Sequence, residues 1–564
     1  MESLMWPGED AVPGGGARPG TPPGAEDLAT VDDDAARDLE LDAVVDWIGA
    51  VRPDRRAYVR HLLTHPPLRL AAIRWRAAAM RDVLASPRLA DALESAARAL
   101  DELGKHRPEH FPSQVGRAAR IGARVVELRA FLRTLAILGD ALAGDDVRAP
   151  ALLALREDVR QTLEAPETRG LQAEMPALSA ALEQVRSVTV GINVGPGLEP
   201  EGAVLLGFSN RAASAVDTAL LRFTRAQGQG PGQASGQGQR GLVRLFRHSP
   251  VNWQGEGRMV GDVQALLEAV ATPIERALHG YRSIQTQAVL HLHDEFVTLV
   301  GAARMARQWA AAGLPASVAE FPDPDAGEGW AAQDGFHPVL ARQTSSGAAL
   351  TLNGVAFGPR GTVWILTGPN RGGKTTYLRA AGLVQVLGQC GLPVPARSAR
   401  LRPAARVFTH FPVPEAGVAG QGRLDEEAER MGRIFAACSP GDMVLLNEVL
   451  AGTSAPEGSA LAADILRGLR IAGCNVVYAT HLHDLARRTD ELNGSVEGAA
   501  PIRSLTVRTE ADHGQGALVR RPTYRVVPGE PEGASFFASQ IARRHGVSLP
   551  QIVATLQGKA AAPG

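Results

Sequence analysis

The sequence predicts a mostly α-helical N-terminal domain followed by a C-terminal α/β domain built on a parallel sheet. Between residues 36 and 190, apolar side chains such as Val44, Val45 and Ile48 recur every three to four positions, the period of one helix face. From Val363 onward the pattern changes to short apolar runs, each followed by a turn and a helical pattern, which is typical of βα units. At 564 residues the chain is too long for a single core, so two or three domains are expected.

Composition marks the domain boundaries. Residues 1–35 are rich in Gly, Pro and Asp without any periodicity, which predicts a disordered lead-in. Residues 36–330 are expected to form the helical domain. Within it, residues 227–239 read QGQGPGQASGQGQ and offer no side chains for a core, so a flexible Gly/Gln insertion is expected there. Residues 331–564 are expected to form the α/β domain.

Three local patterns lie within the helical domain. Apolar runs at residues 187–194 and 203–208 predict a pair of strands. Several arginines between residues 52 and 81 could form a phosphate-contacting face, although solvated helix faces are the simpler interpretation. The run HLHDEF at residues 291–296 gathers histidines and acids, but positions i and i+2 do not share a helix face. A metal site there would need a non-helical backbone.

Charge and cysteine content limit the possible functions. The chain has 59 Lys and Arg against 60 Asp and Glu, which gives no global electrostatic case for binding nucleic acid or acidic membranes, although a local basic patch remains possible. Its cysteines, Cys390, Cys438 and Cys474, are too few for a disulfide framework or a four-ligand metal site. Neither a signal peptide nor an apolar run long enough to cross a membrane is visible, so a cytoplasmic location is expected.

A phosphate-binding motif follows the apolar run at residues 363–366. Gly368, Gly373, Lys374 and Thr375 satisfy G-x-x-x-x-G-K-[ST] in the required order of strand, loop and helix. The glycines let backbone N–H groups surround phosphates, Lys374 can reach the β- and γ-phosphates, and Thr375 offers a hydroxyl to Mg2+. Only three lysines occur in the whole chain, so a chance match is rare. The motif predicts ATP and Mg2+ as cofactors.

Two later apolar runs end in polar residues. Residues 443–446 precede Asn447 and Glu448, where P-loop ATPases place an acidic pair after a buried parallel strand. Glu448 is placed to orient or deprotonate the attacking water. Asn447 stands where an aspartate usually helps to hold Mg2+ through its water shell, so weaker Mg2+ binding or slower turnover is expected. Residues 474–479 precede His481, which is suited to sensing the γ-phosphate.

These motifs resemble the ATPase domain of the MutS family over about residues 330–557. TGPNRGGKTTYLR (367–379) is similar to that family's TGPNMGGKSTYMR, including Pro369 and Asn370, and FHPVL (336–340) resembles its entry motif. LLNEVLAGTSAPEGSALA (445–462) resembles its Walker B and dimer-crossing segment, and VVYATHLHDL (476–485) its switch segment. The residues from 523 onward resemble its C-terminal dimerisation elements. The resemblance implies a nucleotide-binding set of Gly368, Pro369, Asn370, Gly372, Gly373, Lys374, Thr375 and Thr376.

The resemblance further implies an ABC-type P-loop fold, a helical core and lever domain, and a homodimer with composite ATP sites. Gly422, Thr453 and Ser454 are expected at the site in trans, with Gly422 in the place of the family's signature serine. Because the helical pattern begins by about residue 38, no counterpart of the family's mismatch-reading domain is expected in this sequence.

The function implied is ATP-dependent DNA binding, in which ATP binding and hydrolysis gate a dimeric clamp in mismatch repair or related processing of DNA structures. Mismatched or branched DNA, a second copy of the chain and other repair proteins are the expected partners, and no membrane partner is expected. The alternative is a nucleotide-binding scaffold with little turnover that engages protein or ribosomal partners. Asn447, Gly422 and the near-zero net charge favour this alternative. A transport ATPase of the ABC class would need membrane partners and a serine-rich signature, and neither is visible.

Overall fold

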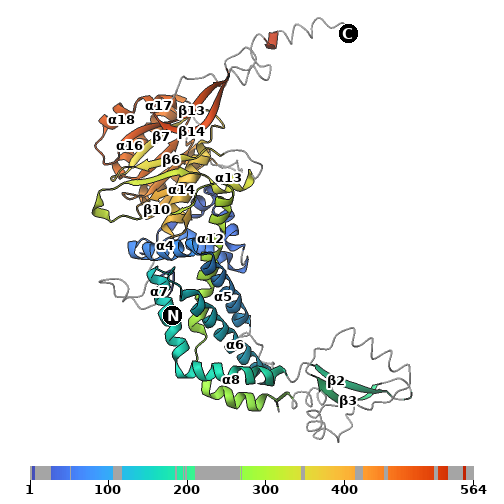
Figure 1. The fold of residues 1–564 in the computed structure, drawn as a ribbon. Helices are drawn as coiled ribbons and strands as arrows, with labels where there is room; N and C mark the ends of the chain where they lie inside the picture. Colours follow the sequence, from blue (N-terminus) through green and yellow to red (C-terminus); the bar gives the residue numbers. More distant parts are fainter. Residues whose placement is uncertain are drawn as a thin grey trace, which may run out of the picture. The chain divides into compact units, whose positions relative to one another are not determined.

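The computed structural model describes most of the chain, which divides into two compact units (Figure 1). Unit 1 contains Ser95–Ala141 and Arg156–His293, and unit 2 contains Glu2–Glu94, Leu142–Leu155 and Asp294–Gly564. The described residues are 3–6, 27–50, 53–105, 117–183, 187–194, 196, 200–209, 267–268, 270–344, 350–412, 423–449, 455–512, 519–530 and 551–553.

Unit 1 is helical, with one strand pair. The helical pattern predicted for this stretch is confirmed by α6 (Arg117–Leu142), α8 (Pro166–Glu183) and the later parts of α5 (Pro87–Lys105) and α7 (Pro150–Glu164), two helices that begin in unit 2. The short η5 (His279–Tyr281) and α11 (Gln287–Leu290) follow later in the chain. The predicted strand pair is confirmed, because β2 (Ser187–Val194) pairs antiparallel with β3 (Pro200–Ser209). Inside the unit, the buried Glu127 accepts a hydrogen bond from Thr286 and pairs with Arg124 at 2.8 Å.

Unit 2 is built on a seven-stranded sheet in the order β1-β10-β11-β12-β7-β13-β14. All neighbours are parallel except β13 and β14, which form an antiparallel pair. Every residue of β11 and β12 is buried, as expected for parallel strands covered on both faces. The strands are β1 (Thr30–Val31), β7 (Thr362–Thr367), β10 (Arg406–His410), β11 (Met443–Asn447), β12 (Asn475–Ala479), β13 (Ile502–Asp512) and β14 (Val519–Pro528).

Helices cover both faces of this sheet (Figure 1). Alternate residues of a strand point to opposite faces. Leu445 of β11 lies against Gly382 of α14, whereas Val444 and Leu446 belong to one core cluster with residues of α15 and α16. The helices of the α/β part are α13 (Pro338–Gln343), α14 (Lys374–Gln389), α15 (Arg423–Ala437), α16 (Ala455–Ala472), α17 (His483–Arg487) and α18 (Thr489–Ser495).

Smaller elements complete unit 2. A three-stranded antiparallel sheet runs in the order β6-β5-β9, and β4 pairs with β8. These strands are β4 (Ser317–Val318), β5 (Trp330–Gly335), β6 (Asn353–Phe357), β8 (Pro393–Val394) and β9 (Ser398–Arg400). The remaining helices are α1 (Asp33–Asp38), α2 (Leu41–Gly49), η3 (Pro53–Arg55), α3 (Arg56–Thr64), α4 (Leu70–Ala85), α12 (Leu292–Ala311) and η6 (Pro324–Ala326).

The N-terminal part of the chain differs from the sequence expectation. Residues 28–35, expected to be disordered, include β1, which adds an edge strand to the sheet by pairing in parallel with β10, and the start of α1. Leu4 and Met5 are fully buried as well. The boundary expected at residue 330 does not separate the two units, because unit 2 also contains Glu2–Glu94. Residues 7–26 and the Gly/Gln insertion at 227–239 lie outside the described residues.

Glu295, one of the acidic residues in the run HLHDEF, has a structural role. Glu295 at the start of α12 is buried, and its carboxylate accepts hydrogen bonds from Ser3 Oγ at 2.5 Å and from Leu4 N at 2.7 Å. Burial raises the pKa of Glu295 to about 7, against the opposing effect of these two donors. The described part of the chain contains no group of three or more His, Cys, Asp or Glu residues that could hold a metal ion.

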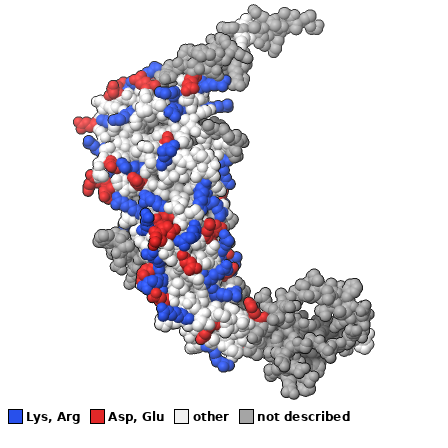
Figure 2. All heavy atoms as spheres, in the orientation of Figure 1, with Lys and Arg blue, Asp and Glu red and all other residues white. Residues whose placement is uncertain are grey.

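Charged side chains of both signs are interspersed over the face seen in Figure 2, as the near-zero net charge leads one to expect. Among the described helices, none has the length and apolar character needed to cross a membrane.

Two helix glycines predict opposite effects on stability. At Gly301 of α12 an added Cβ would lie 2.1 Å from the carbonyl oxygen of Ile48, whereas Gly432 of α15 has no atom within 4 Å of that position. Gly301→Ala should therefore lower the free energy of unfolding by about 1–3 kcal/mol, because two helix backbones must move apart. Gly432→Ala should raise it by roughly 0.5–1 kcal/mol through helix propensity. Urea denaturation of both variants tests this, and a stabilised Gly301→Ala would contradict the packing of α12 on α2.

Candidate functional site

Three polar strand ends meet at one edge of the sheet. β11, β12 and β7 are adjacent and parallel, with Asn447 opposite Ala479 and Ala479 opposite Leu366. The ladder continues one step further, since Glu448 N donates to Ala479 O and Thr480 N donates to Leu366 O. The segments that follow the three strands therefore leave the sheet side by side. This is the edge at which open α/β sheets bind ligands.

The segment after β7 is a tight glycine loop that opens α14. Gly372 N donates to the carbonyl oxygen of Pro369 at 3.0 Å, which closes a turn. Gly373 has φ +86°, a left-handed conformation that side chains disfavour, and it caps the N-terminus of α14. Gly368 lies so close to β13 that an added Cβ would be 2.7 Å from Val507 Cγ2. The two motif glycines are therefore required by local geometry.

Lys374, the first residue of α14, lies back across this loop. Its side chain is buried, and Nζ donates hydrogen bonds to the carbonyl oxygens of Gly368 at 3.1 Å and Pro369 at 3.3 Å. Nζ is also 3.9 Å from Glu448 Oε1. Burial lowers the pKa of Lys374 to about 8, and the nearby Glu448 carboxylate only partly offsets this effect.

Glu448 and His481 form the shortest polar contact of the site. His481 Nε2 is 2.7 Å from Glu448 Oε1 and 3.5 Å from Lys374 Nζ. The shorter contact requires a proton on Nε2, so we assign His481 as the donor to the carboxylate. This hydrogen bond holds the pKa of Glu448 below its ordinary value. Glu448 also has φ +53°, a left-handed conformation that is uncommon for a non-glycine residue and common at functional sites.

Oxygen atoms lie beside the lysine. Thr375 Oγ1 is 3.5 Å from Asn447 Oδ1, and Asn447 is buried at the end of β11. Together with the carboxylate of Glu448, this hydroxyl and this amide form a set of oxygen donors, which is the chemistry that Mg2+ prefers. The residues present therefore fit the ion that the sequence predicts.

A cavity of about 530 Å³ opens beside the loop. Its lining includes residues of the loop, Glu448 and a group of aromatic and aliphatic side chains. The apolar lining includes Phe336, Leu340, Leu350, Val355, Tyr377 and Tyr524. A lining that combines the backbone N–H groups of the loop with apolar side chains suits an amphipathic ligand.

Tyr524 is a site residue that the motif analysis missed. It belongs to β14, and its Cδ1 atom lies 3.3 Å from the position of a Cβ on Gly373, so the ring covers the loop. Asn353 fixes this part of β14 by donating to Tyr524 O at 3.0 Å and accepting from Val526 N at 2.8 Å. No spacing rule links Tyr524 to a loop some 150 residues earlier. The available signal is that the chain contains only five tyrosines.

The other predicted site residues are placed as follows. Pro369 and Thr376 are half-buried in or next to the loop, and Asn370 is exposed at its tip. The three residues expected at the site in trans lie outside the described residues: Gly422, Thr453 and Ser454. The residues from 531 onward, expected to carry the C-terminal dimerisation helices, are described only at 551–553.

Comparisons with known proteins match the part of the chain that carries these residues. Residues 364–512 match the family model of MutS domain V, which includes the glycine loop, Glu448 and His481. The chain is 30% identical over 327 residues to the DNA mismatch repair protein MutS of Sorangium cellulosum (strain So ce56), covering 53% of this chain and 33% of that protein. It is 26% identical over 408 residues to the protein of the same name from Chlorobium chlorochromatii (strain CaD3), covering 67% and 46%.

A third similar protein, the DNA mismatch repair protein MutS of Granulibacter bethesdensis, is 35% identical over 160 residues, or 28% of this chain and 17% of that protein. The chain thus spans less than half the length of each of these relatives. The similarity nevertheless extends well beyond domain V into the helical part. Residues 364–512 thus carry domain V of the MutS family, and the similarity to MutS proteins covers about two thirds of the chain.

Proposed function

We propose that this chain binds and hydrolyses ATP at the edge formed by β7, β12 and β11. The observation that carries the proposal is the convergence of Lys374, Glu448 and His481, which come from three different strand ends, on one point within 3.9 Å of each other at the N-terminus of α14. A lysine, a helix N-terminus and a glycine loop together attract phosphate oxygens. The glycine loop residues Gly368, Pro369, Asn370, Gly372, Gly373, Lys374, Thr375 and Thr376 would hold the phosphates.

The cavity beside the loop suits the rest of the nucleotide. Its apolar lining would hold the base, and the exposed ring of Tyr524 lies over the loop, where it can close this side of the pocket. Lys374 would exchange its bonds to the carbonyl oxygens of Gly368 and Pro369 for phosphate oxygens. Because the lysine is already buried and held next to the loop, little side-chain freedom is lost when the nucleotide binds.

Hydrolysis would use Glu448 and His481. The ionised carboxylate of Glu448 would orient and accept a proton from the attacking water, and His481 would keep that carboxylate in place through its 2.7 Å hydrogen bond. Thr375 would hold Mg2+ directly, and Asn447 and Glu448 would hold it through water; when bound, the ion offsets charge on the phosphates. The neutral amide of Asn447 leads us to expect slow turnover.

We further propose that ATP binding controls an interaction with DNA. The three relatives are named DNA mismatch repair proteins, and this supports mismatched or branched DNA as the partner of this chain. A homodimer in which Gly422, Thr453 and Ser454 complete the partner's ATP site, and contacts with other repair proteins in the bacterial cytoplasm, belong to the same proposal. ATP-driven closure of the dimer would then change the grip on DNA.

A nucleotide-dependent scaffold with little turnover is the second candidate. It is favoured by Asn447, which places a buried neutral side chain where an acid usually stands. The deciding experiment is ATP turnover of the purified full chain alone and with homoduplex, mismatched and branched DNA. Stimulation by one kind of DNA supports the DNA-processing ATPase and identifies its substrate. Tight ATP binding with turnover that is indifferent to every DNA would instead support the scaffold.

Replacement of Glu448 should separate binding from hydrolysis. Glu448→Ala removes the group that orients the water but leaves the loop and Lys374 in place, so ATP should still bind while kcat falls by roughly 10²–10⁴-fold. Binding is measured by calorimetry and turnover by phosphate release. Glu491→Ala, which removes an exposed glutamate paired with Arg488, is the matched control and should leave both unchanged. If Glu448→Ala and the control turn over ATP at the same rate, Glu448 has no part in hydrolysis.

The pKa of Lys374 predicts how ATP affinity depends on pH. In the free chain this pKa is lowered to about 8, and bound phosphates would raise it, so binding takes up a proton at higher pH. Affinity should be nearly constant below pH 7 and should fall above pH 8 by at most about tenfold per pH unit. Lys374→Arg keeps its charge at all these pH values and should bind ATP with little pH dependence. A wild-type affinity that is flat between pH 7 and 9.5 would contradict this prediction, since either the pKa of Lys374 is not lowered or its ammonium does not contact phosphate.

A further inference from the structure

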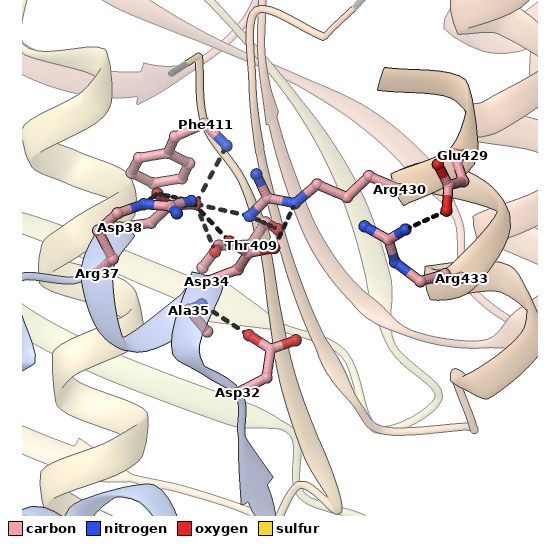
Figure 3. A network of polar contacts seen from close by, with 10 residues as sticks. All are labelled: Asp32, Asp34, Ala35, Arg37, Asp38, Thr409, Phe411, Glu429, Arg430 and Arg433. Atoms are coloured by element: carbon pink, nitrogen blue, oxygen red, sulfur yellow. Dashed lines mark hydrogen bonds and ion pairs between the residues drawn. The ribbon is translucent and has the colours of Figure 1, made fainter. Parts of the chain in front are cut away.

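The N-terminal segment formed by residues 32–40, here called the α1 segment, contacts both helices that flank the nucleotide site. Its helix α1 is capped by Asp32, whose side chain accepts from Ala35 N at 2.7 Å. It lies beside β10, far from the α/β part in sequence but inside unit 2. Figure 3 shows its polar side chains meeting α15 and the end of β10.

Asp38 is the centre of these contacts. Only 6% of its side chain is exposed, and Oδ2 accepts from Thr409 Oγ1 at 2.7 Å, from Arg430 Nη2 at 2.9 Å and from Phe411 N at 3.3 Å. Oδ1 accepts from Arg37 at 3.3 Å (Figure 3). A buried carboxylate with this many donors is fully satisfied, and losing Arg430 would leave the more exposed Arg37 as its remaining charged partner.

Arg430 connects Asp38 to α15. Its side chain is 11% exposed, and besides Asp38 it contacts the carbonyl oxygen of Thr409 at 2.8 Å and Asp34 at 3.4 Å. Three fixed contacts on one guanidinium set the rotation and position of the helix that carries it. One turn further along the same helix, Arg433 pairs with Glu429 in solvent, with 61% and 64% of the two side chains exposed (Figure 3).

The same segment also holds α14, the helix that begins at Lys374. Arg379 of α14 donates from Nε to the carbonyl oxygen of Asp38 at 2.8 Å, and its Nη1 is 2.6 Å from Glu40 Oε1. Glu40 has φ +58°, an uncommon backbone conformation that places its carboxylate on Arg379. Leu39, fully buried, lies so close to α14 that a Cβ on Gly382 would be 2.4 Å from its Cδ2.

Both helices lead directly to the proposed site. α15 packs through Met431 and Ile434 into the core cluster that contains Val444 and Leu446 of β11, and β11 ends at Asn447 beside Glu448. α14 begins with Lys374 and Thr375. The lysine half and the acidic half of the site are therefore held by two helices that share Asp38 and its neighbours as a common support.

We propose that Asp38 and Arg430 are positioning residues of the nucleotide site, through which the α1 segment fixes the distance between Lys374 and Glu448. The inference rests on the proposed ATPase function. It assigns to an N-terminal segment, outside the matched domain V, a part in aligning the groups that act on the nucleotide. Displacement of catalytic groups by about 1 Å costs up to roughly 10²-fold in rate, so a small shift of α15 is enough to matter.

The test compares Asp38→Asn and Arg430→Gln with Arg433→Gln in the full chain. Asp38→Asn keeps an oxygen for Thr409 and Phe411 but loses the charge that holds Arg430. We expect kcat to fall roughly 10- to 100-fold in both variants with ATP affinity nearly unchanged, and Arg433→Gln to behave as wild type. The double variant Asp38→Asn/Arg430→Gln should lose no more than either single variant, because the two residues act as one pair. If Arg430→Gln does not fold, Arg430→Lys replaces it in the same measurement, because it keeps a buried positive charge but cannot make all three contacts of the guanidinium.

A purely structural role predicts a different result. If the variants melt at lower temperature but keep the wild-type kcat per folded molecule, or if Arg433→Gln loses as much kcat as Arg430→Gln, the proposal is overturned.

Amide hydrogen exchange separates this proposal from the function on which it rests. In nucleotide-free protein, Asp38→Asn should speed exchange in the first turn of α14 and at the end of β11, whereas Arg433→Gln should not. If the wild type neither binds nor hydrolyses ATP, the proposed function fails, yet this exchange difference still reports the coupling. Unchanged exchange at both places in a folded Asp38→Asn protein would refute the positioning role, whatever the turnover.

Discussion

The in-register parallel pairing of β7, β12 and β11 is the constraint on which the rest of the site depends. It places Leu366, Ala479 and Asn447 at one level, so the three following segments leave the sheet next to one another. A slip of one residue in any strand would turn its side chains to the other face and separate the lysine from its acidic partner. The helices on the two faces exclude that slip, because Leu445 fits against Gly382 on one face and its neighbours fill the core on the other.

The sequence was most informative where the chemistry is local. Short apolar runs after turns predict buried parallel strands, and the structure confirms the two strands that end at Asn447 and Ala479. Glu448 and His481 are in contact because β11 and β12 are neighbouring parallel strands that end together, an adjacency that the apolar runs alone do not specify. The roles of these residues in binding and hydrolysis stay predictions. Tyr524 was missed because its place over the loop depends on the pairing of β13 with β14, which no local motif encodes.

The structure of the N-terminal segment could not be predicted from local sequence patterns. β1 has two residues and no periodicity, and Asp38 looks like a solvated charge in an acidic stretch. Only the tertiary structure shows that Asp38 is buried and shared among β10, α14 and α15, partners more than 300 residues away in sequence. Polar groups buried by non-local contacts leave no repeat in the sequence, so the composition of residues 1–35 did not reveal that β1 and the start of α1 belong to the sheet of unit 2.

The burial of Lys374 also affects the chemical reactivity of its side-chain amine. Lys374 is one of only three lysines in the chain, and its burial leaves more of it unprotonated near neutral pH than an exposed lysine. The unprotonated amine is the form that attacks electrophiles. A small acylating reagent that enters the pocket would therefore meet an amine with a larger unprotonated fraction at neutral pH than an ordinary lysine has. The burial that suits Lys374 to the proposed phosphate site would thus also favour covalent modification of its amine.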